Sequence, residues 1–463
     1  MSYKRMLAIL ACLTVAVALS ACSAGEPTSS SSASSTTLAS SAETTTSTDT
    51  AGSPQSSAVA TTTVTDDSTR GEISRSGPIT QDEVWSGTVH ITGDVVVKAG
   101  HTLTILPGTV VLFAAHRDDT HGEMDSTGPY EPDEWIRLNN DPTWTREYAE
   151  SHIKLDVYGT LVARGTPDNW ITFTSDSSTP DGGDWMHVQV NINSQIEYCI
   201  IEYSRGGLDV AEKTGSSVLI SHNIMRHNLW TGLAIHSCSP TVTFNEIYAS
   251  GGHQGIDILG ENCAPLIAHN LLRHNKVGII IQPGTTPVVE SNILVDNDHG
   301  ITAIDSIGAV IRANTIDATN GAPEGWSYMN RPVYPANAEE GRSGDLIGIR
   351  LINSSPLVVG NQVMKGANGM SIEGDSSPEI RRNTIVGSTS NGLFFAESFS
   401  GSPVIHENNI YGQSCNVGSV SAQPIEVSRN WWGTTDVEKI AQTVRSQGPI
   451  TYEPFLEEPV ELP

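Results

Sequence analysis

From about residue 85 onward, short runs of alternating apolar and polar residues are separated by Gly, Asn and Pro. Two of these runs are Gly255-Ile256-Asp257-Ile258 and Gly278-Ile279-Ile280-Ile281. Alternation with a period of two is typical of short strands, and it predicts that the residue after each Gly points inward and that the next one, such as Asp257 or Arg350, points outward. The predicted inward residues are Leu233, Ile256, Ile279, Ile301, Ile349, Met370 and Leu393.

The runs belong to a repeat of 22 or 25 residues, with one longer step of 47. An Asn followed two residues later by an apolar residue marks it at Asn223, Asn245, Asn270, Asn292, Asn314, Asn361, Asn383, Asn408 and Asn430. A Pro followed two residues later by an aliphatic residue keeps the same phase at Pro240, Pro265, Pro287, Pro356, Pro378 and Pro403. A unit this short does not hold a strand and a helix, and it fits one coil of a parallel β-helix.

Coils of a β-helix stack at about 4.8 Å, so equivalent residues lie directly over one another. We therefore expect the repeated asparagines to form an interior amide ladder, in which each side chain hydrogen-bonds the next. Ordinary turn chemistry is the alternative explanation for them.

Several segments carry a family resemblance. These are W-S-G-T-V-H-I-T-G-D-V-V-V from Trp85, T-L-T-I-L-P-G-T-V-V-L-F from Thr102, L-D-V-Y-G-T-L-V-A-R-G-T from Leu155, and N-W-W-G-T-T-D from Asn430. The chain resembles the right-handed parallel β-helix repeat proteins, the pectate-lyase-like solenoids. This resemblance implies an all-β solenoid of about a dozen 22–25-residue coils over residues 75–458. It leaves the activity open, because the fold also serves polygalacturonases, alginate epimerases, copper-site maturation factors and adhesins.

After the last coil, Asp436 is placed to cap a short amphipathic helix. Its apolar residues, Val437, Ile440, Ala441 and Val444, fall on one face. We expect this helix to cover the open end of the coil stack.

Residues 1–22 combine Lys4-Arg5, an apolar stretch and Leu19-Ser20-Ala21-Cys22. This group resembles a bacterial lipobox and predicts a signal peptide that ends at a lipidated Cys22, which would anchor the chain in a membrane. An ordinary cleaved signal peptide is the alternative. The Ser- and Thr-rich residues 23–72 cannot bury a core and predict a disordered tether. Together they place the domain at the cell envelope, outside the cytoplasm.

The net charge of −27 argues against nucleic acid or anionic lipid as a partner. It is compatible with neutral glycans, or with anionic glycans bridged by cations. Cys238 and Cys263 each stand two residues before the repeated Pro, so we expect them on adjacent coils and joined by a disulfide. A reduced pair of stacked cysteines is the alternative.

Two insertions break the repeat, at about 114–152 and 320–345, and both are rich in aromatic residues. Such rings either stack on sugars or pin the loops to the coil wall. The first insertion also holds Asp118, Asp119 and His121, which could bind Ca²⁺ or another divalent cation, or form a solvated acidic loop. The absence of an EF-hand spacing favours the solvated loop. The candidate sugar-binding residues are Trp135, Trp144, Trp230, Trp326, Tyr328 and Arg350.

Aligning the repeats places His253, Lys276 and Asp298 in one column. An imidazole, an amine and a carboxylate on successive coils could act as base, charge neutraliser and acid on a glycan. A polar ridge without catalytic function is the alternative. We therefore predict a surface lipoprotein that engages extracellular or cell-wall polysaccharide, with two alternatives: a lyase, hydrolase or epimerase acting on the coil wall, or a structural or adhesive protein.

Overall fold

The computed structural model describes residues 72–122, 146–191, 193–211, 217–250, 254–318 and 346–461. The predicted signal peptide with Cys22 and nearly all of the predicted tether lie outside the described residues. So do most of both insertions, with Trp135, Trp144, Trp326 and Tyr328, and also His253. In the described part of the chain, no helix is long and apolar enough to cross a membrane.

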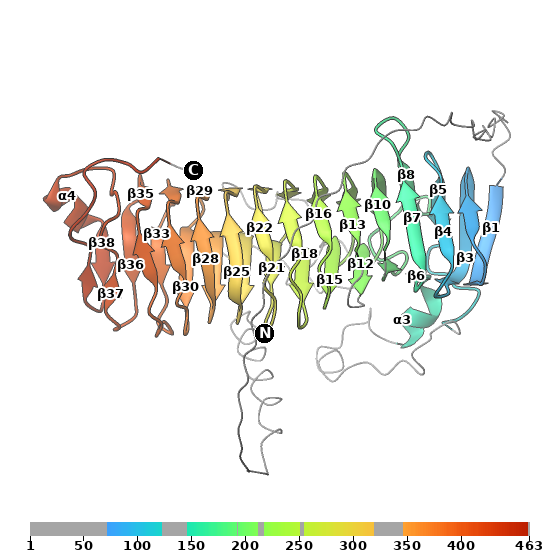
Figure 1. The fold of residues 1–463 in the computed structure, drawn as a ribbon, viewed down its shortest axis with the longest axis horizontal. Helices are drawn as coiled ribbons and strands as arrows, with labels where there is room; N and C mark the ends of the chain where they lie inside the picture. Colours follow the sequence, from blue (N-terminus) through green and yellow to red (C-terminus); the bar gives the residue numbers. More distant parts are fainter. Residues whose placement is uncertain are drawn as a thin grey trace, which may run out of the picture. The chain divides into compact units, whose positions relative to one another are not determined.

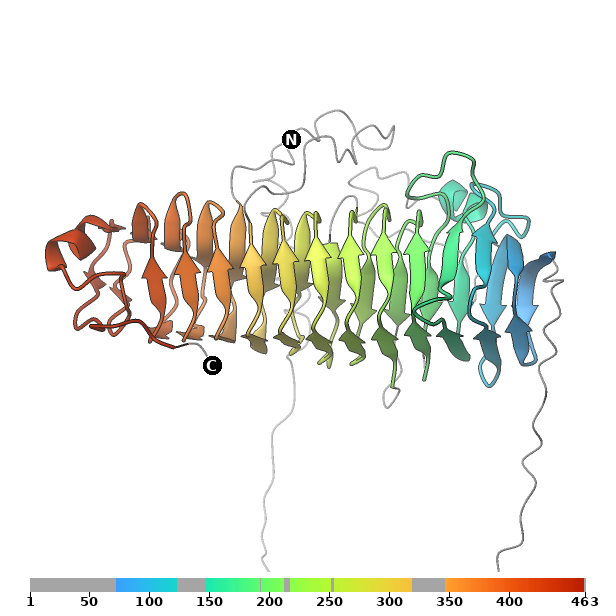
Figure 2. The same ribbon diagram turned by 90° about the horizontal axis from the view of Figure 1, so that it is seen from above.

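The described chain winds into coils of short parallel strands, stacked one on another (Figures 1 and 2). Three strands contribute to a typical coil, so the stack has three faces. Face 2 is a 12-stranded sheet, and faces 1 and 3 join through β3 into a 25-stranded sheet. This arrangement confirms the predicted all-β solenoid of about a dozen coils.

The strands of face 1 are β3 (Thr88–Val97), β6 (Leu155–Val157), β9 (Val188–Val190), β12 (Leu208–Ala211), β15 (Leu233–His236), β18 (Gln254–Leu259), β21 (Val277–Ile281), β24 (His299–Ile304), β27 (Ile347–Ile352), β30 (Asn368–Glu373), β33 (Asn391–Phe395), β36 (Cys415–Ser419) and β38 (Val444–Ser446). Those of face 2 are β2 (Glu83–Trp85), β4 (Thr102–Ile105), β7 (Thr160–Arg164), β10 (Gln195–Glu197), β13 (Leu219–Ser221), β16 (Thr241–Thr243), β19 (Leu266–Ala268), β22 (Val288–Glu290), β25 (Ile307–Arg312), β28 (Ser355–Val359), β31 (Glu379–Arg381) and β34 (Val404–His406). Those of face 3 are β1 (Glu72–Ile79), β5 (Val110–Phe113), β8 (Ile171–Ser175), β11 (Cys199–Glu202), β14 (Ile224–Arg226), β17 (Glu246–Tyr248), β20 (Leu271–Arg273), β23 (Ile293–Val295), β26 (Thr315–Asp317), β29 (Gln362–Met364), β32 (Thr384–Val386) and β35 (Asn409–Tyr411).

The interior of the stack is filled by the aliphatic residues that alternate along the strands. All seven residues predicted to point inward, from Leu233 to Leu393, have no exposed surface. The Gly before each of them is required by the stacking: a Cβ on Gly255 would lie 2.7 Å from the carbonyl oxygen of Gly278 on the next coil. The alternation and the Gly marker therefore both follow from the stacking on face 1: the alternating aliphatic residues fill the interior, and the Gly allows the coils to approach closely.

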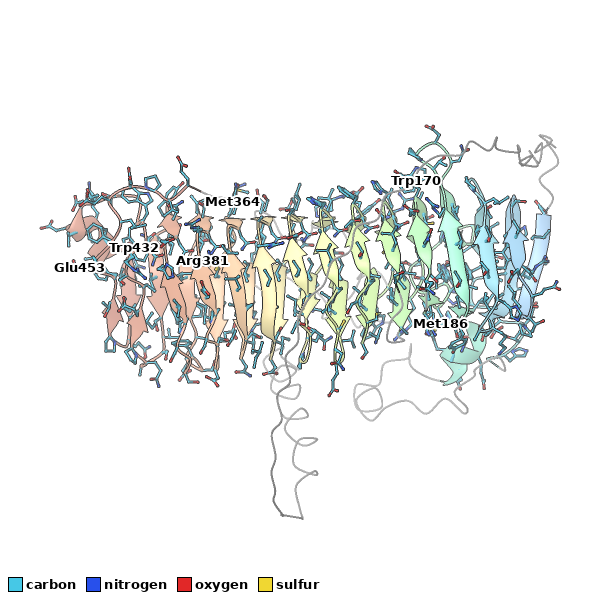
Figure 3. All side chains as sticks on the ribbon, in the orientation of Figure 1. Trp170, Met186, Met364, Arg381, Trp432 and Glu453 are labelled. Carbon is cyan, nitrogen blue, oxygen red and sulfur yellow. The ribbon has the colours of Figure 1, made fainter. Side chains whose placement is uncertain are left out.

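The end of the stack carries the predicted helix, α4 (Val437–Gln442), and a small sheet of β37 (Ile425–Glu426) and β39 (Ile450–Thr451). The side chain of Asp436 accepts hydrogen bonds from the backbone N–H groups of Glu438 and Lys439, as an N-cap does. Trp432 is buried beside this end of the stack (Figure 3). The helix uses Ile440 as its buried contact, whereas Val437 is 47% exposed, so its apolar face is narrower than predicted.

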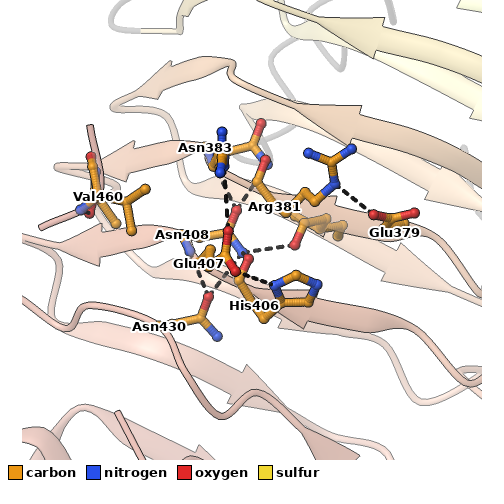
Figure 4. Close-up of polar contacts among 11 residues, drawn as sticks. Glu379, Arg381, Asn383, His406, Glu407, Asn408, Asn430 and Val460 are labelled. Carbon is orange, nitrogen blue, oxygen red and sulfur yellow. Dashed lines mark hydrogen bonds and ion pairs between the residues drawn. The ribbon is translucent and has the colours of Figure 1, made fainter. Parts of the chain in front are cut away.

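The predicted amide ladder is present at the corner between faces 2 and 3. It runs without interruption from Asn223 to Asn430, and its last rungs are drawn in Figure 4. At a typical rung, the Oδ1 atom of Asn292 accepts from the backbone N–H and the Nδ2 of Asn270, at 2.9 and 3.0 Å. Its own Nδ2 donates to the carbonyl oxygen of Ile267 at 2.8 Å. Each Asn thus satisfies buried polar groups on two coils.

We expect Asn292→Ala to destabilise the fold by about 2–4 kcal/mol, because it removes the buried acceptor that two donors of Asn270 share and a buried donor to the carbonyl oxygen of Ile267. Urea denaturation followed by circular dichroism measures this change. The matched control is Asn169→Ala, at an exposed turn position, which should change stability by less than about 0.5 kcal/mol. Equal effects of the two substitutions would refute the role of the ladder.

Candidate functional site

Acidic and basic side chains, with one amide, follow face 1 on successive coils, and we call this row the acid–imidazole stripe. It consists of Asp94, Lys154, Asp156, His187, Asp209, His236, Asp257 and Gln282. Alternation along the strands explains the arrangement: Leu208 and Val210 point into the core, so Asp209 between them points outward. Asp257 lies outward between Ile256 and Ile258 for the same reason.

Strand register fixes the spacing of the carboxylates. Asp156 and Asp209 both pair with Gln189, and Asp209 and Asp257 both pair with Ala234. The three aspartates therefore occupy alternate rungs, about 10 Å apart at two coil rises. Ala234 lies on the rung between Asp209 and Asp257 and carries only a methyl group. We call the position over this methyl group, between the two aspartates, the notch.

The histidines reach these carboxylates diagonally. His187 directs Nε2 to Asp156 at 3.2 Å and Nδ1 to Asp209 at 4.0 Å. His236 directs Nε2 to the other oxygen of Asp209 at 3.2 Å. The second ring nitrogen of His236 faces away from this carboxylate, and the side chain is 43% exposed. An imidazole oriented by a carboxylate at one nitrogen and open at the other is suited to proton transfer.

The environment pushes the pKa values of the two aspartates beside the notch apart. Burial raises the pKa of Asp257 to about 6, although a hydrogen bond from Gln282 at 2.7 Å opposes the shift. Burial also acts on Asp209, but the hydrogen bond and charge of His236, with the charges of His187 and Arg205, outweigh it and lower the pKa of Asp209. Burial lowers the pKa of His236, and the contact with Asp209 overcomes this, so its pKa lies above the ordinary value.

At the start of the stripe, Asp94 is completely buried. Its backbone N–H donates to Asp118 at 3.1 Å, and its Oδ1 accepts from the backbone N–H of Lys154 at 2.9 Å. Burial and the nearby charge of Asp118 raise the pKa of Asp94 to about 7. The Lys154 ammonium lies 4.0 Å from Asp94 and 3.8 Å from Asp156, so it links the buried acid to the stripe.

A second polar cluster fastens α3 (Arg146–Ser151) beside the coils. The Nδ1 of His152 lies 2.8 Å from the carbonyl oxygen of Tyr148, so this nitrogen carries the proton. Its Nε2 then accepts from the Nδ1 of His116 at 2.7 Å, and the Nε2 of His116 lies 3.3 Å from Asp184. Because the hydrogen bonds of these side chains are satisfied within the cluster, we interpret the cluster as a structural contact that holds α3 beside the coils.

The predicted column is partly assembled. The side-chain amide of Asn275 donates a hydrogen bond to that of Asn297 on the next coil, which sets Lys276 beside Asp298. Burial lowers the pKa of Lys276 against the opposing effect of Asp298, which shows that the two charges interact. Trp230 is half-buried, and the guanidinium of Arg205 lies 5.3 Å from its ring centre.

Arg350 lies on face 1 in the same outward column as Asp257, three rungs further along. Its guanidinium binds Glu373 in a bidentate pair, at 2.7 and 2.9 Å. The sequence therefore predicted the outward position of Arg350, and the structure adds its acidic partner.

The three candidate metal ligands are not gathered into one site. Asp118 is buried, and its oxygens accept hydrogen bonds from the backbone N–H groups of Asp94, Thr120 and Gly122. Asp119 and His121 are exposed. Within the described residues, no group of three or more His, Cys, Asp or Glu side chains is arranged to hold a metal ion.

Cys238 and Cys263 lie on adjacent coils as predicted, but they are free thiols and no disulfide joins them. The Sγ of Cys238 faces the carbonyl oxygen of Val210 at 3.4 Å, and the Sγ of Cys263 faces the carbonyl oxygen of Cys238 at 2.8 Å. Each sulfur is therefore directed at a backbone carbonyl of the preceding coil and not at the other sulfur.

Sequence reasoning identified the outward direction of Asp257 but missed His187, Asp209 and His236. A signal for one of them exists: Gly207-Leu208-Asp209-Val210 has the same pattern as Gly255-Ile256-Asp257-Ile258. An acidic residue between two inward aliphatic residues is uncommon in strands. Two such runs on nearby coils therefore point to one surface.

The family model described as "Right handed beta helix region" matches residues 210–323. No curated protein matches the chain. Among solved structures, the chain is similar to an alginate lyase from Paenibacillus sp. str. FPU-7, with 13% identity over 67% of this chain and 93% of that one, at a TM-score of 0.35.

The chain is also similar to the periplasmic alginate epimerase AlgG, with 13% identity over 82% of this chain and 77% of that one, at a TM-score of 0.32. A double mutant of the same epimerase matches with 12% identity over 72% and 73%, at a TM-score of 0.40. The family match agrees with the right-handed parallel β-helix that the family resemblance implied, and this fold does not specify an activity.

We expect Asp257→Asn to stabilise the protein at pH 7.5 and to leave its stability unchanged at pH 4. The folded state holds the proton of Asp257 up to about pH 6, whereas the unfolded carboxyl loses it near 3.8. The cost of the buried charge therefore grows between these values and is complete above pH 6, where its removal should contribute about 1–3 kcal/mol.

Urea denaturation at the two pH values measures this difference. The matched control is Asp317→Asn on face 3, whose partly exposed carboxylate pairs with Lys365 at 3.2 Å. It should change stability by less than about 1 kcal/mol at either pH. The same gain from Asp257→Asn at both pH values would contradict the assigned cause.

Proposed function

We propose that this parallel β-helix is a polysaccharide hydrolase whose acid–base pair is His236 and Asp257. The observation that carries the proposal is the notch at Ala234. It is flanked by two aspartates of opposite pKa shift, and one of them orients an imidazole. Paired titratable groups with divergent pKa values are typical of acid–base sites.

Asp257 has the properties of the general base. With a pKa of about 6 it is ionised at neutral pH and still basic enough to take a proton from water. The activated water attacks the anomeric carbon of a sugar in the notch. Gln282, which donates to Oδ1 of Asp257 at 2.7 Å, fixes the direction of this carboxylate.

His236 has the properties of the general acid. Its raised pKa favours the imidazolium near neutral pH, and Asp209 stabilises that charge at 3.2 Å. The proton goes from the imidazolium to the leaving glycosidic oxygen as the bond to the anomeric carbon breaks. One proton is thus taken up by Asp257 and one is released by His236, so the pair is ready again after proton exchange with solvent.

The long row of outward polar residues on face 1 suits a polymer more than a small molecule. The partly exposed part of the stripe spans four coils, from Asp209 on β12 to Gln282 just after β21. A chain of sugars lying along the stack would meet a carboxylate at every second coil, about 10 Å apart. This geometry supports a polysaccharide as the partner.

We expect Asp257→Asn and His236→Gln each to lower kcat/KM by about 10²–10⁴, because each removes one proton-transfer group. Reducing-end release from polysaccharides by the full-length protein measures this loss. Asp317→Asn is the matched control and should retain wild-type activity. Wild-type protein that retains a polysaccharide without forming products would make the chain a binding protein.

The pH dependence gives an independent check. The rate should rise through pH 6 as Asp257 ionises and fall at higher pH as His236 loses its proton. Asp209→Asn removes the charge that raises the pKa of His236, so the alkaline limb should move to lower pH. The acidic limb should move less, because Asp209 is only a minor cause of the raised pKa of Asp257. An alkaline limb that does not move would exclude His236 as the acid.

The proposed site fits a protein displayed at the cell envelope through a lipid on Cys22 and the tether of residues 23–72. Cys22→Ala should then release the protein from the membrane fraction of a bacterial host. Immunoblotting of cell fractions measures this, with Cys12→Ala, in the predicted leader, as the matched control. Membrane association that survives Cys22→Ala would rule out this anchor.

A further inference from the structure

The charges along face 1 indicate which class of substrate the site takes, and this inference rests on the proposed hydrolase function. We propose that the sugar bound in the notch is uncharged and that the substrate is a neutral polysaccharide. The basic side chains and the carboxylates of the stripe already contact one another.

The basic side chains of the stripe contact its own carboxylates. Lys154 lies between Asp94 and Asp156, at 4.0 and 3.8 Å. His187 faces Asp156 at 3.2 Å, and His236 faces Asp209 at 3.2 Å. A uronate carboxylate would have to displace one of these carboxylates, and breaking a partly buried ion pair leaves a charge without its partner.

The next cation along the same outward column is committed in the same way. Arg350 grips Glu373 through two hydrogen bonds, and the hydroxyl of Ser371 donates to that carboxylate at 2.9 Å. Both side chains of the pair are less than one-fifth exposed. The guanidinium of Arg350 already has a carboxylate partner, so it is poorly suited to bind an anionic sugar.

The notch itself repels an anion. Asp209 and Asp257 lie on the rungs on either side of Ala234, so a carboxylate between them would meet two like charges. Juxtaposed like charges cost several kcal/mol in a partly desolvated site. The chain as a whole, at −27, adds to the repulsion of a polyanion.

A cationic sugar is excluded by the chemistry of the base. Asp257 has no ion-pair partner among the described residues, so an amino sugar would place its ammonium against this carboxylate. The new ion pair would stabilise the charged form of Asp257 and so weaken it as a base. An amine-bearing glycan should therefore bind in the notch as an inhibitor and not as a substrate.

The groups on the next two coils of the same column are uncharged. Asp257 pairs with Ile280, and Ile280 pairs with Thr302. Gln282, two residues after Ile280, donates its amide to Asp257 at 2.7 Å. A neutral amide beside the notch is suited to the hydroxyl groups of an uncharged sugar.

The test is hydrolysis by the full-length protein of soluble polymers of three charge classes: neutral glycans (glucan, xylan and galactomannan), a polyuronate and a glucosamine polymer. We expect a neutral polymer to be cleaved with kcat/KM at least 100-fold above the polyuronate. KM should change less than twofold between 50 and 500 mM NaCl, because no charged group of the substrate is screened. The glucosamine polymer should inhibit cleavage competitively.

Binding by Asp257→Asn provides a second measurement that does not depend on turnover. The variant should retain the neutral polymer and lose affinity for the glucosamine polymer at least tenfold, because its carboxylate is gone. Polyuronate cleavage that requires Asp257 and His236 would overturn the inference and leave the proposed hydrolysis intact. Failure to cleave any polymer, or cleavage unaffected by both substitutions, would overturn the proposed function instead.

Discussion

Hydrogen bonding between stacked coils is the constraint on which the rest of this structure depends. Each coil repeats the backbone path of its neighbour at about 4.8 Å, so every buried polar group must find its partner directly above or below. At the corner between faces 2 and 3 the partner is an Asn side chain, as between Asn270 and Asn292. Because one Asn serves two coils, a shift of register at one rung would leave donors unpaired at the next.

The same constraint builds the surface of face 1. Strict register turns residues far apart in the chain into neighbours in one outward column, and alternation decides which of them face solvent. Asp209 and Asp257 are 48 positions apart by their numbers, yet both pair with Ala234. A rigid, register-locked sheet also holds side chains with little freedom, which is the condition for preorganised acid–base groups.

This arrangement carries a cost in stability. A carboxylate such as Asp257 is held where burial disfavours its charge, and the fully buried Asp94 is under the same influence. Groups kept in an unfavourable protonation environment are more readily explained by chemistry than by folding. The ladder and the aliphatic core supply the stability that tolerates them.

Much of the fold was predictable from particular residues. The repeated Asn, Pro and Gly positions report contacts that recur at every coil, so they predicted the solenoid, the ladder and the inward aliphatic residues. The site was less predictable, because His187 and Asp209 lie in coils before the regular markers begin, where lengths vary and no repeat fixes the alignment. Cys238 and Cys263 show a further limit of the sequence. It predicted correctly that they lie on adjacent coils, but it could not give the direction in which each sulfur points.

The sequence by itself determined the parallel coil, its period and the direction of each alternating residue, because these follow from local geometry repeated many times. Only the tertiary structure decided which polar side chains meet. The pairing of His236 with Asp209, of Gln282 with Asp257 and of Arg350 with Glu373 depends on the register between coils and on side-chain reach across it. Those quantities arise from the stack as a whole, and no single coil encodes them.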